Sequence, residues 1–88
     1  MKDEMFEANL RLALTMTEKE VRSAMETHGD FRSAHEGYAV ILEELDELWD
    51  EVKKRGARRD RDQMTQEAKQ VAAMGVKFLM FMLNPSNR

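Results

Sequence analysis

The chain has 88 residues, of which 42% are hydrophobic and 35% are charged, with one Pro, four Gly and no Cys. This length allows one domain, 1–88, with a modest core, and the absence of Cys excludes disulfides, thiolate nucleophiles and cysteine-based metal sites. The net charge is −3 and is unevenly distributed: acidic residues concentrate between residues 36 and 51, and basic residues between 53 and 61. This distribution argues against a general nucleic-acid-binding protein.

The first predicted element is a helix over residues 3–28. Its apolar residues recur at roughly helical spacing, and Gly29 is a stop signal directly after it. Thr17 to Glu20 has the pattern of a capping box, which leaves open a second helix start at this point. One continuous helix is favoured because no Gly or Pro interrupts the segment. The charged segment 1–7 lacks the apolar core of a signal peptide, so we expect a cytoplasmic protein.

A second helix is predicted from residue 34 to about Arg55, because Ser33 begins a capping-box pattern and Gly56 follows as a stop signal. Its acidic residues gather on one side of the helix. Val40 shares that side, which indicates that the acidic face is partly covered. The apolar residues form a stripe on the other side that is expected to face a core, namely Tyr38, Ile41, Leu42, Leu45, Leu48, Trp49 and Val52.

The third predicted helix follows a short basic connection, begins with Asp60 or Asp62 as its N-cap, and ends before Pro85. Between residues 71 and 83 the only charged side chain is Lys77, so apolar groups point in every direction around the axis. Three helices of one chain cannot cover them all. The sequence therefore predicts an all-α helical bundle of about three helices that is completed by oligomerisation. The apolar run is short for a membrane span.

The motif Glu43-Glu44-Leu45-Asp46-Glu47 is the strongest indication of chemistry. Glu44 and Glu47 are three residues apart, where like charges on a helix repel, and a divalent cation would remove that repulsion. Glu67 follows twenty positions after Glu47, and a helical hairpin would bring its carboxylate alongside. Carboxylate oxygens are ligands for Mg²⁺ and Mn²⁺. An acidic helix face is also commonly just solvated, and on spacing alone that alternative stays open.

The segments from Ser33 to Trp49 and from Glu67 to Met74 resemble the small MazG-like proteins, including phage and prophage members. The family pattern, E-E-x-x-E on one helix and E-x-x-D on the next, covers roughly residues 30–80; the first half is matched fully and the second in part. The resemblance implies an all-α hydrolase that works as a dimer or a dimer of dimers. Such enzymes cleave nucleoside triphosphates between the α and β phosphates and release a nucleoside monophosphate and pyrophosphate.

The resemblance also implies roles for single residues. Mg²⁺, with Mn²⁺ as an alternative, would be held by Glu44, Glu47, Glu67 and the residue at position 70. Glu43 would orient a water or a ligand, and Glu43 or Glu47 would accept the proton of the attacking water. Position 70 is Gln70 instead of Asp, and a neutral amide is a poorer ligand for a hard cation. This departure keeps a second hypothesis open, a non-catalytic interaction module or nucleotide-binding regulator with a degenerate site.

Six basic residues surround the connection between the second and third helices. Among them Lys53, Lys54 and Arg58 are candidates for contacting the triphosphate. Basic residues at a helix C-terminus also complement the helix dipole, and that role alone explains their position. The expected partners are a nucleoside triphosphate and further copies of this chain, and no membrane is expected. Nucleic acid is not expected either, because Asp60 and Asp62 interrupt the basic cluster.

Overall fold

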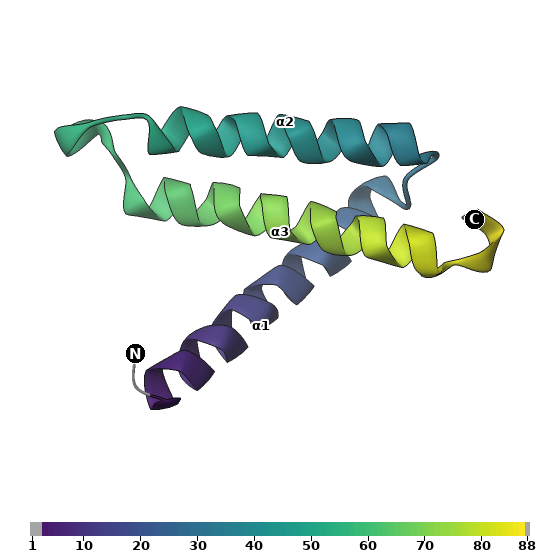
Figure 1. The fold of residues 1–88 in the computed structure, drawn as a ribbon, viewed down its shortest axis with the longest axis horizontal. Coiled ribbons are helices and arrows are strands. Elements are labelled where there is room, and N and C mark those ends of the chain that lie inside the picture. The colour runs from purple at the N-terminus through teal and green to yellow at the C-terminus, as the bar shows by residue number, and fades with distance from the viewer. Residues whose placement is uncertain (1–2, 88) are drawn as a thin grey trace.

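The computed structural model describes residues 3–87 and consists of three α-helices joined by short connections (Figure 1). The helices are α1 (Asp3–His28), α2 (Ala34–Val52) and α3 (Arg61–Leu83). Two short 3-10 helices, Gly56–Arg58 and Pro85–Asn87, follow α2 and α3, and no strand occurs within residues 3–87. The prediction of an all-α chain with three helices is confirmed.

α1 is one unbroken helix. The second start near Thr17 does not occur, because the Thr17 hydroxyl donates to the carbonyl of Ala13 at 2.8 Å within the helix. Gly29 follows the last turn with φ 74°, a left-handed conformation that glycine adopts without a side-chain clash. Its N–H donates to the carbonyl of Met25 at 2.9 Å, so α1 ends where the stop signal predicted.

α2 begins at the predicted cap and ends slightly early. The Ser33 hydroxyl accepts the N–H of Glu36 at 3.1 Å, and the Glu36 carboxylate accepts the N–H of Arg32 at 2.8 Å. The helix stops at Val52, before the predicted end. The Arg59 guanidinium donates to the carbonyl of Val52, so a side chain from the following connection satisfies a group at the helix end.

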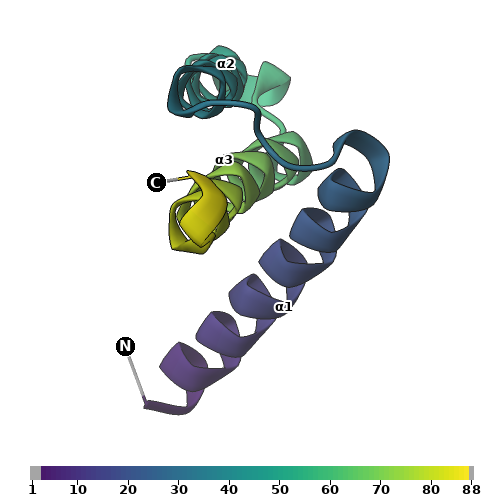
Figure 2. The same cartoon turned by 90° about the vertical axis from the view of Figure 1, so that its right-hand side faces the viewer.

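α2 and α3 run antiparallel and side by side, and α1 crosses α3 at an angle (Figures 1 and 2). Asp60 caps α3 by accepting the N–H groups of Asp62 and Gln63 at 2.9 and 3.3 Å. The two helices approach closely at Gly37, where a Cβ would lie 2.7 Å from Cδ2 of Phe78. A glycine at this point therefore lets α2 approach α3 at the end where the loop from α1 arrives.

The core of the single chain is small and lies between α3 and the C-terminal part of α1. Its buried hydrophobic residues are Val21, Ala24, Phe31, Ala73, Met74 and Phe81. The prediction that the apolar stripe of α2 faces this core is wrong for four of its residues. The face of α2 that carries Gly37 packs against Phe78, and these side chains, which lie on another side of the helix, are 43–65% exposed. We call them the outer α2 stripe: Tyr38, Leu42, Leu45 and Trp49.

The N-terminal part of α1 projects away from the α2–α3 hairpin (Figures 1 and 2). The radius of gyration is 14.8 Å, against about 12 Å for a compact chain of this length. Residues 4–15, which we call the α1 arm, carry exposed Met5, Phe6, Leu10, Leu12 and Leu14. No described helix is long and apolar enough to cross a membrane. A large apolar surface thus remains open in the single chain.

Candidate metal centre and its pocket

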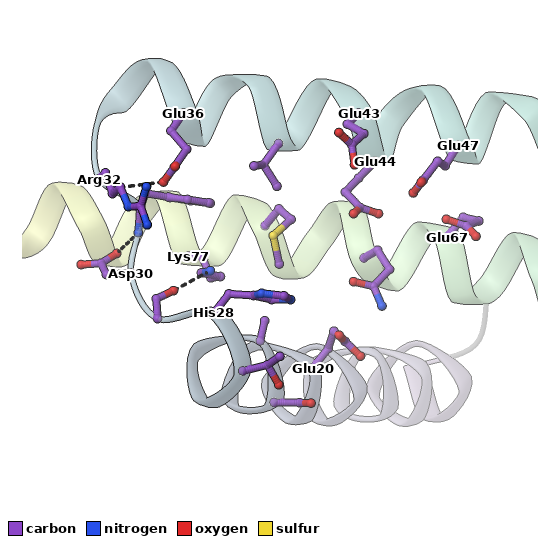
Figure 3. Close-up of a pocket in the computed structure, with 18 residues that line it drawn as sticks. Glu20, His28, Asp30, Arg32, Glu36, Glu43, Glu44, Glu47, Glu67 and Lys77 are labelled. Carbon is purple, nitrogen blue, oxygen red and sulfur yellow. Dashed lines mark hydrogen bonds between the residues drawn. The ribbon is translucent and has the colours of Figure 1, made fainter.

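Three carboxylates meet between α2 and α3 (Figure 3). Glu44 and Glu47 come from neighbouring turns of α2, and Glu67 comes from the antiparallel helix beside them. One carboxylate oxygen from each lies within 4.8 Å of the other two. The short connection between the helices sets this register, so the expected approach of Glu67 to the α2 motif is confirmed.

The pKa of Glu44 reflects its burial and the mutual repulsion of these carboxylates. Its pKa is raised from 4.5 to about 7, mainly because burial disfavours the charged carboxylate, and also because of a side-chain hydrogen bond with Glu47 and the charges of Glu47, Glu67 and Glu43. At neutral pH the cluster therefore retains a proton for part of the time. A divalent cation held among these oxygens would replace that proton and compensate the charge.

The carboxylates line one end of a cavity of about 740 Å³, enclosed by α1, α2, α3 and the loop after α1 (Figure 3). This volume lies within the usual range for small-molecule sites. Val40 and Met74 line its middle from α2 and α3, and His28 lies across from them at the end of α1 (Figure 3). Glu36 and Lys77 line the end remote from Glu67, as their order along the two antiparallel helices requires. The cavity is thus acidic at one end, lined by apolar side chains and one imidazole in the middle, and of mixed charge at the other.

The structure brings most of the predicted site residues together. Glu43 lines the cavity with an exposed side chain, and Gln70 lines it half-buried. The expectation from Val40 that the acidic face is partly covered is confirmed, because Val40 and Glu44 are both half-buried in this cavity. The face is therefore more than a solvated helix surface.

The three basic residues predicted to contact phosphate do not line this cavity in the single chain. Lys53 pairs with Asp50 at 3.0 Å, and Lys54 pairs with Glu51 at 3.0 Å. Both pairs stabilise the last turn of α2. Contact of Lys53, Lys54 or Arg58 with a triphosphate stays a prediction.

Sequence reasoning missed several cavity residues, among them Glu20, Glu36, Lys77 and His28, which lines the cavity from the end of α1 (Figure 3). Glu20 of α1 points toward the cavity from the side opposite Glu44 and pairs with Lys69 at 3.6 Å (Figure 3). Glu36 was predicted to lie in the capping box and on the acidic face of the helix, without a role in a site. Lys77 was noted as the lone charge in an apolar run, and that isolation was the one available signal that it serves a buried site.

The pKa of Glu44 gives a pH dependence that can be measured. Between pH 4.5 and about 7 the folded chain holds a proton that the unfolded chain releases, so the stability of the metal-free protein falls as the pH rises through this window. Mg²⁺ binds the ionised carboxylate, so its affinity is expected to rise with pH and to level off above about 7. Titration calorimetry with MgCl₂ across this window checks the expectation. An affinity that does not change with pH would contradict it.

Comparison with known proteins adds no relative. No protein-family model, no curated protein and no solved structure matches the chain. The resemblance to MazG-like proteins therefore stays a prediction from the sequence motifs, and the structure itself shows the convergence of Glu44, Glu47 and Glu67.

Proposed function

We propose that this protein is an Mg²⁺-dependent nucleoside triphosphate pyrophosphohydrolase that releases a nucleoside monophosphate and pyrophosphate. One observation carries the proposal: Glu44, Glu47 and Glu67 converge within 4.8 Å at the end of a nucleotide-sized cavity. The MazG-like motif supplies the reaction type. A hard cation such as Mg²⁺ binds carboxylate oxygens and phosphate oxygens together, so these carboxylates suit a nucleotide that binds as its Mg²⁺ complex.

The residues present fit such a cation. Glu44, Glu47 and Glu67 would hold it, with the amide oxygen of Gln70 as a weaker fourth donor, and the raised pKa of Glu44 supports a site in need of positive charge. When bound, Mg²⁺ supplies Lewis acidity toward phosphate oxygens and lowers the pKa of water. Oxygen donors of this kind prefer Mg²⁺ or Mn²⁺ to softer metals.

The chain itself contributes positioning and proton transfer. Glu43 lies beside the metal ligands with its side chain exposed, where it can accept the proton of a water entering from solvent. Glu47 is the alternative acceptor when its second oxygen is free. The walls of the cavity orient the ligand, and in-line attack on phosphorus depends mainly on such positioning, so no covalent nucleophile is required.

A homo-oligomer completes the proposal. The accessible surface of the chain is 6992 Å², about 1,600 Å² more than the roughly 5,400 Å² expected for a folded monomer of this mass. Covering this excess on two copies would bury an area typical of obligate homodimers. The outer α2 stripe and the α1 arm are the surfaces that we propose to be covered.

Gln70 supports a second candidate. It lies half-buried in the cavity at the position where the MazG-like pattern has an acid. With three carboxylates instead of four the site can bind a metal and a nucleotide without fast turnover. A nucleotide-binding regulator, or an interaction module with a degenerate site, is the function that would follow.

Pyrophosphate release separates the two candidates. Purified protein is incubated with ribo- and deoxyribonucleoside triphosphates and either Mg²⁺ or Mn²⁺, and pyrophosphate is measured against a Glu47→Gln control. Release above this control supports the enzyme. Absence of release with all of them, while nucleotide binding persists, would leave the regulator as the function.

The Gln70→Asp variant tests whether position 70 limits the site. We expect tighter Mg²⁺ binding, by about tenfold, because a fourth carboxylate replaces a neutral amide beside the other three. Turnover should rise with it if metal occupancy is limiting. Titration calorimetry and the pyrophosphate assay measure the two effects. Unchanged or weaker binding would show that Gln70 plays no part in holding the cation.

A further inference from the structure

Lys77 is a buried ammonium group at the end of the cavity away from the carboxylates. Its exposed fraction is 3%, its Nζ donates to the carbonyl of Gly29 at 2.9 Å, and Nζ lies 4.5 Å from the ring centroid of Phe31. Within residues 3–87 it forms no salt bridge. An ammonium has three N–H donors and no acceptor, and burying its charge is costly without further partners. The group is suited to an additional acceptor from a ligand.

Glu36 places a carboxylate at the same end of the cavity (Figure 3). It is half-buried, and its Oε1 accepts the backbone N–H of Arg32 at 2.8 Å. Its Oε2 takes no hydrogen bond among the described residues, and it is not paired with Lys77. Asp30 and Arg32 also line this end of the cavity, and Lys77 and Glu36 there are a donor and an acceptor that each retain bonding capacity (Figure 3).

The distance between the two ends suits a nucleoside. Lys77 follows Glu67 by ten residues, which is about 15 Å along α3. Val40 and Met74 line the space between from α2 and α3, and His28 faces it from the end of α1 (Figure 3). Two apolar walls with an imidazole opposite them suit a sugar and a base. A nucleotide whose phosphates lie at the carboxylate end would thus direct its base toward Lys77 and Glu36.

We propose that Lys77 and Glu36 select nucleotides whose base presents a keto oxygen beside a ring N–H, an inference that rests on the proposed function. Lys77 donates to the keto oxygen, and Glu36 accepts the ring N–H. Guanine, uracil and thymine carry this edge. Adenine and cytosine present an amino donor beside a bare ring nitrogen, so a donor would face the ammonium and an acceptor would face the carboxylate.

Base selectivity of turnover is the first test. We expect kcat/KM for GTP and UTP, and for their deoxy counterparts, to exceed that for ATP and CTP by at least about tenfold. Comparison of GTP with UTP distinguishes a purine site from a pyrimidine site. Lys77→Met and Glu36→Gln should each bring the ratio of kcat/KM for GTP or UTP to that for ATP or CTP close to one, mainly by loss of activity on GTP and UTP. Lys19→Met, at an exposed position on α1, is the matched control and should keep the wild-type ratio.

The outcomes separate this inference from the function on which it rests. Turnover with a base ratio that neither variant changes would overturn the inference and leave the function standing. If no nucleotide is turned over, titration with GMP, UMP, AMP and CMP followed by NMR tests the inference by itself. Tighter binding of GMP or UMP that is lost in Glu36→Gln would support it, and equal affinities would overturn it. Thermal unfolding of Lys77→Met shows whether that variant folds, and Glu36→Gln supplies the decisive comparison if it does not.

Discussion

The Glu47→Gln variant is expected to lose pyrophosphate release by at least about 100-fold. The amide is nearly isosteric but neutral, so it removes one of the three converging carboxylates that we propose to hold the metal, and a candidate proton acceptor with it. Mg²⁺ affinity should fall in the same variant. Steady-state pyrophosphate release and calorimetric Mg²⁺ titration measure the two losses.

Stability distinguishes this effect from misfolding. Glu47 repels Glu44 in the metal-free protein, so the amide relieves repulsion and should leave the melting temperature unchanged or higher. Asp46→Asn is the matched control, because Asp46 is exposed on α2 and does not line the cavity. Near wild-type activity in Glu47→Gln, or an equal loss in Asp46→Asn, would contradict the assignment of the metal centre.

The Leu45→Glu variant is expected to weaken self-association by about 100-fold. Leu45 lies in the middle of the outer α2 stripe and is 48% exposed in the single chain. A glutamate there is well solvated in a monomer, but in a covered interface it would be a buried charge without a partner. Light scattering and sedimentation at micromolar concentration follow the change.

Leu45→Met is the control for this variant, since it keeps an apolar side chain of similar volume at the same position. We expect it to remain oligomeric, and we expect the melting temperature of the wild-type protein to rise with concentration. A wild-type protein that is a monomer at micromolar concentration, or a Leu45→Glu variant that associates as the wild type does, would show that the outer stripe is not an interface.

The helices were largely predictable because their boundaries depend on local chemistry. Ser33 and Asp60 act as caps through their own side chains, and Gly29 ends α1 by a conformation that other residues avoid. The end of α2 was predicted too late. The side chain of Arg59 satisfies the carbonyl of Val52 from beyond the helix, and such a contact has no signature in the pattern of α2 itself.

The face that α2 turns inward was not predictable from its periodicity. A stripe of large apolar residues shows that one side is covered, but not whether the cover is the same chain or another copy. Gly37 marks the inward face, because its missing side chain lets Phe78 approach, and Leu45 and Trp49 lie exposed on another side of the helix. The result is a small core with a half-buried acidic face.

One part of the candidate site was predictable from the sequence and the other was not. Glu44, Glu47 and Glu67 follow from helix spacing and a short hairpin, so sequence alone predicted their convergence. The other end of the cavity depends on α1. Lys77 donates a hydrogen bond to the carbonyl of Gly29, which is 48 residues away in the chain, and no local sequence pattern predicts that contact.

Phosphorus NMR of the reaction is the most direct test of the proposed activity. The wild-type protein is incubated with Mg²⁺ and GTP or UTP, and the phosphorus resonances are followed with Glu47→Gln in parallel. We expect nucleoside monophosphate and pyrophosphate to appear in equal amounts with the wild type and not with the variant. A triphosphate that persists, or its conversion to diphosphate and inorganic phosphate, would contradict the assignment of this chain as a pyrophosphohydrolase.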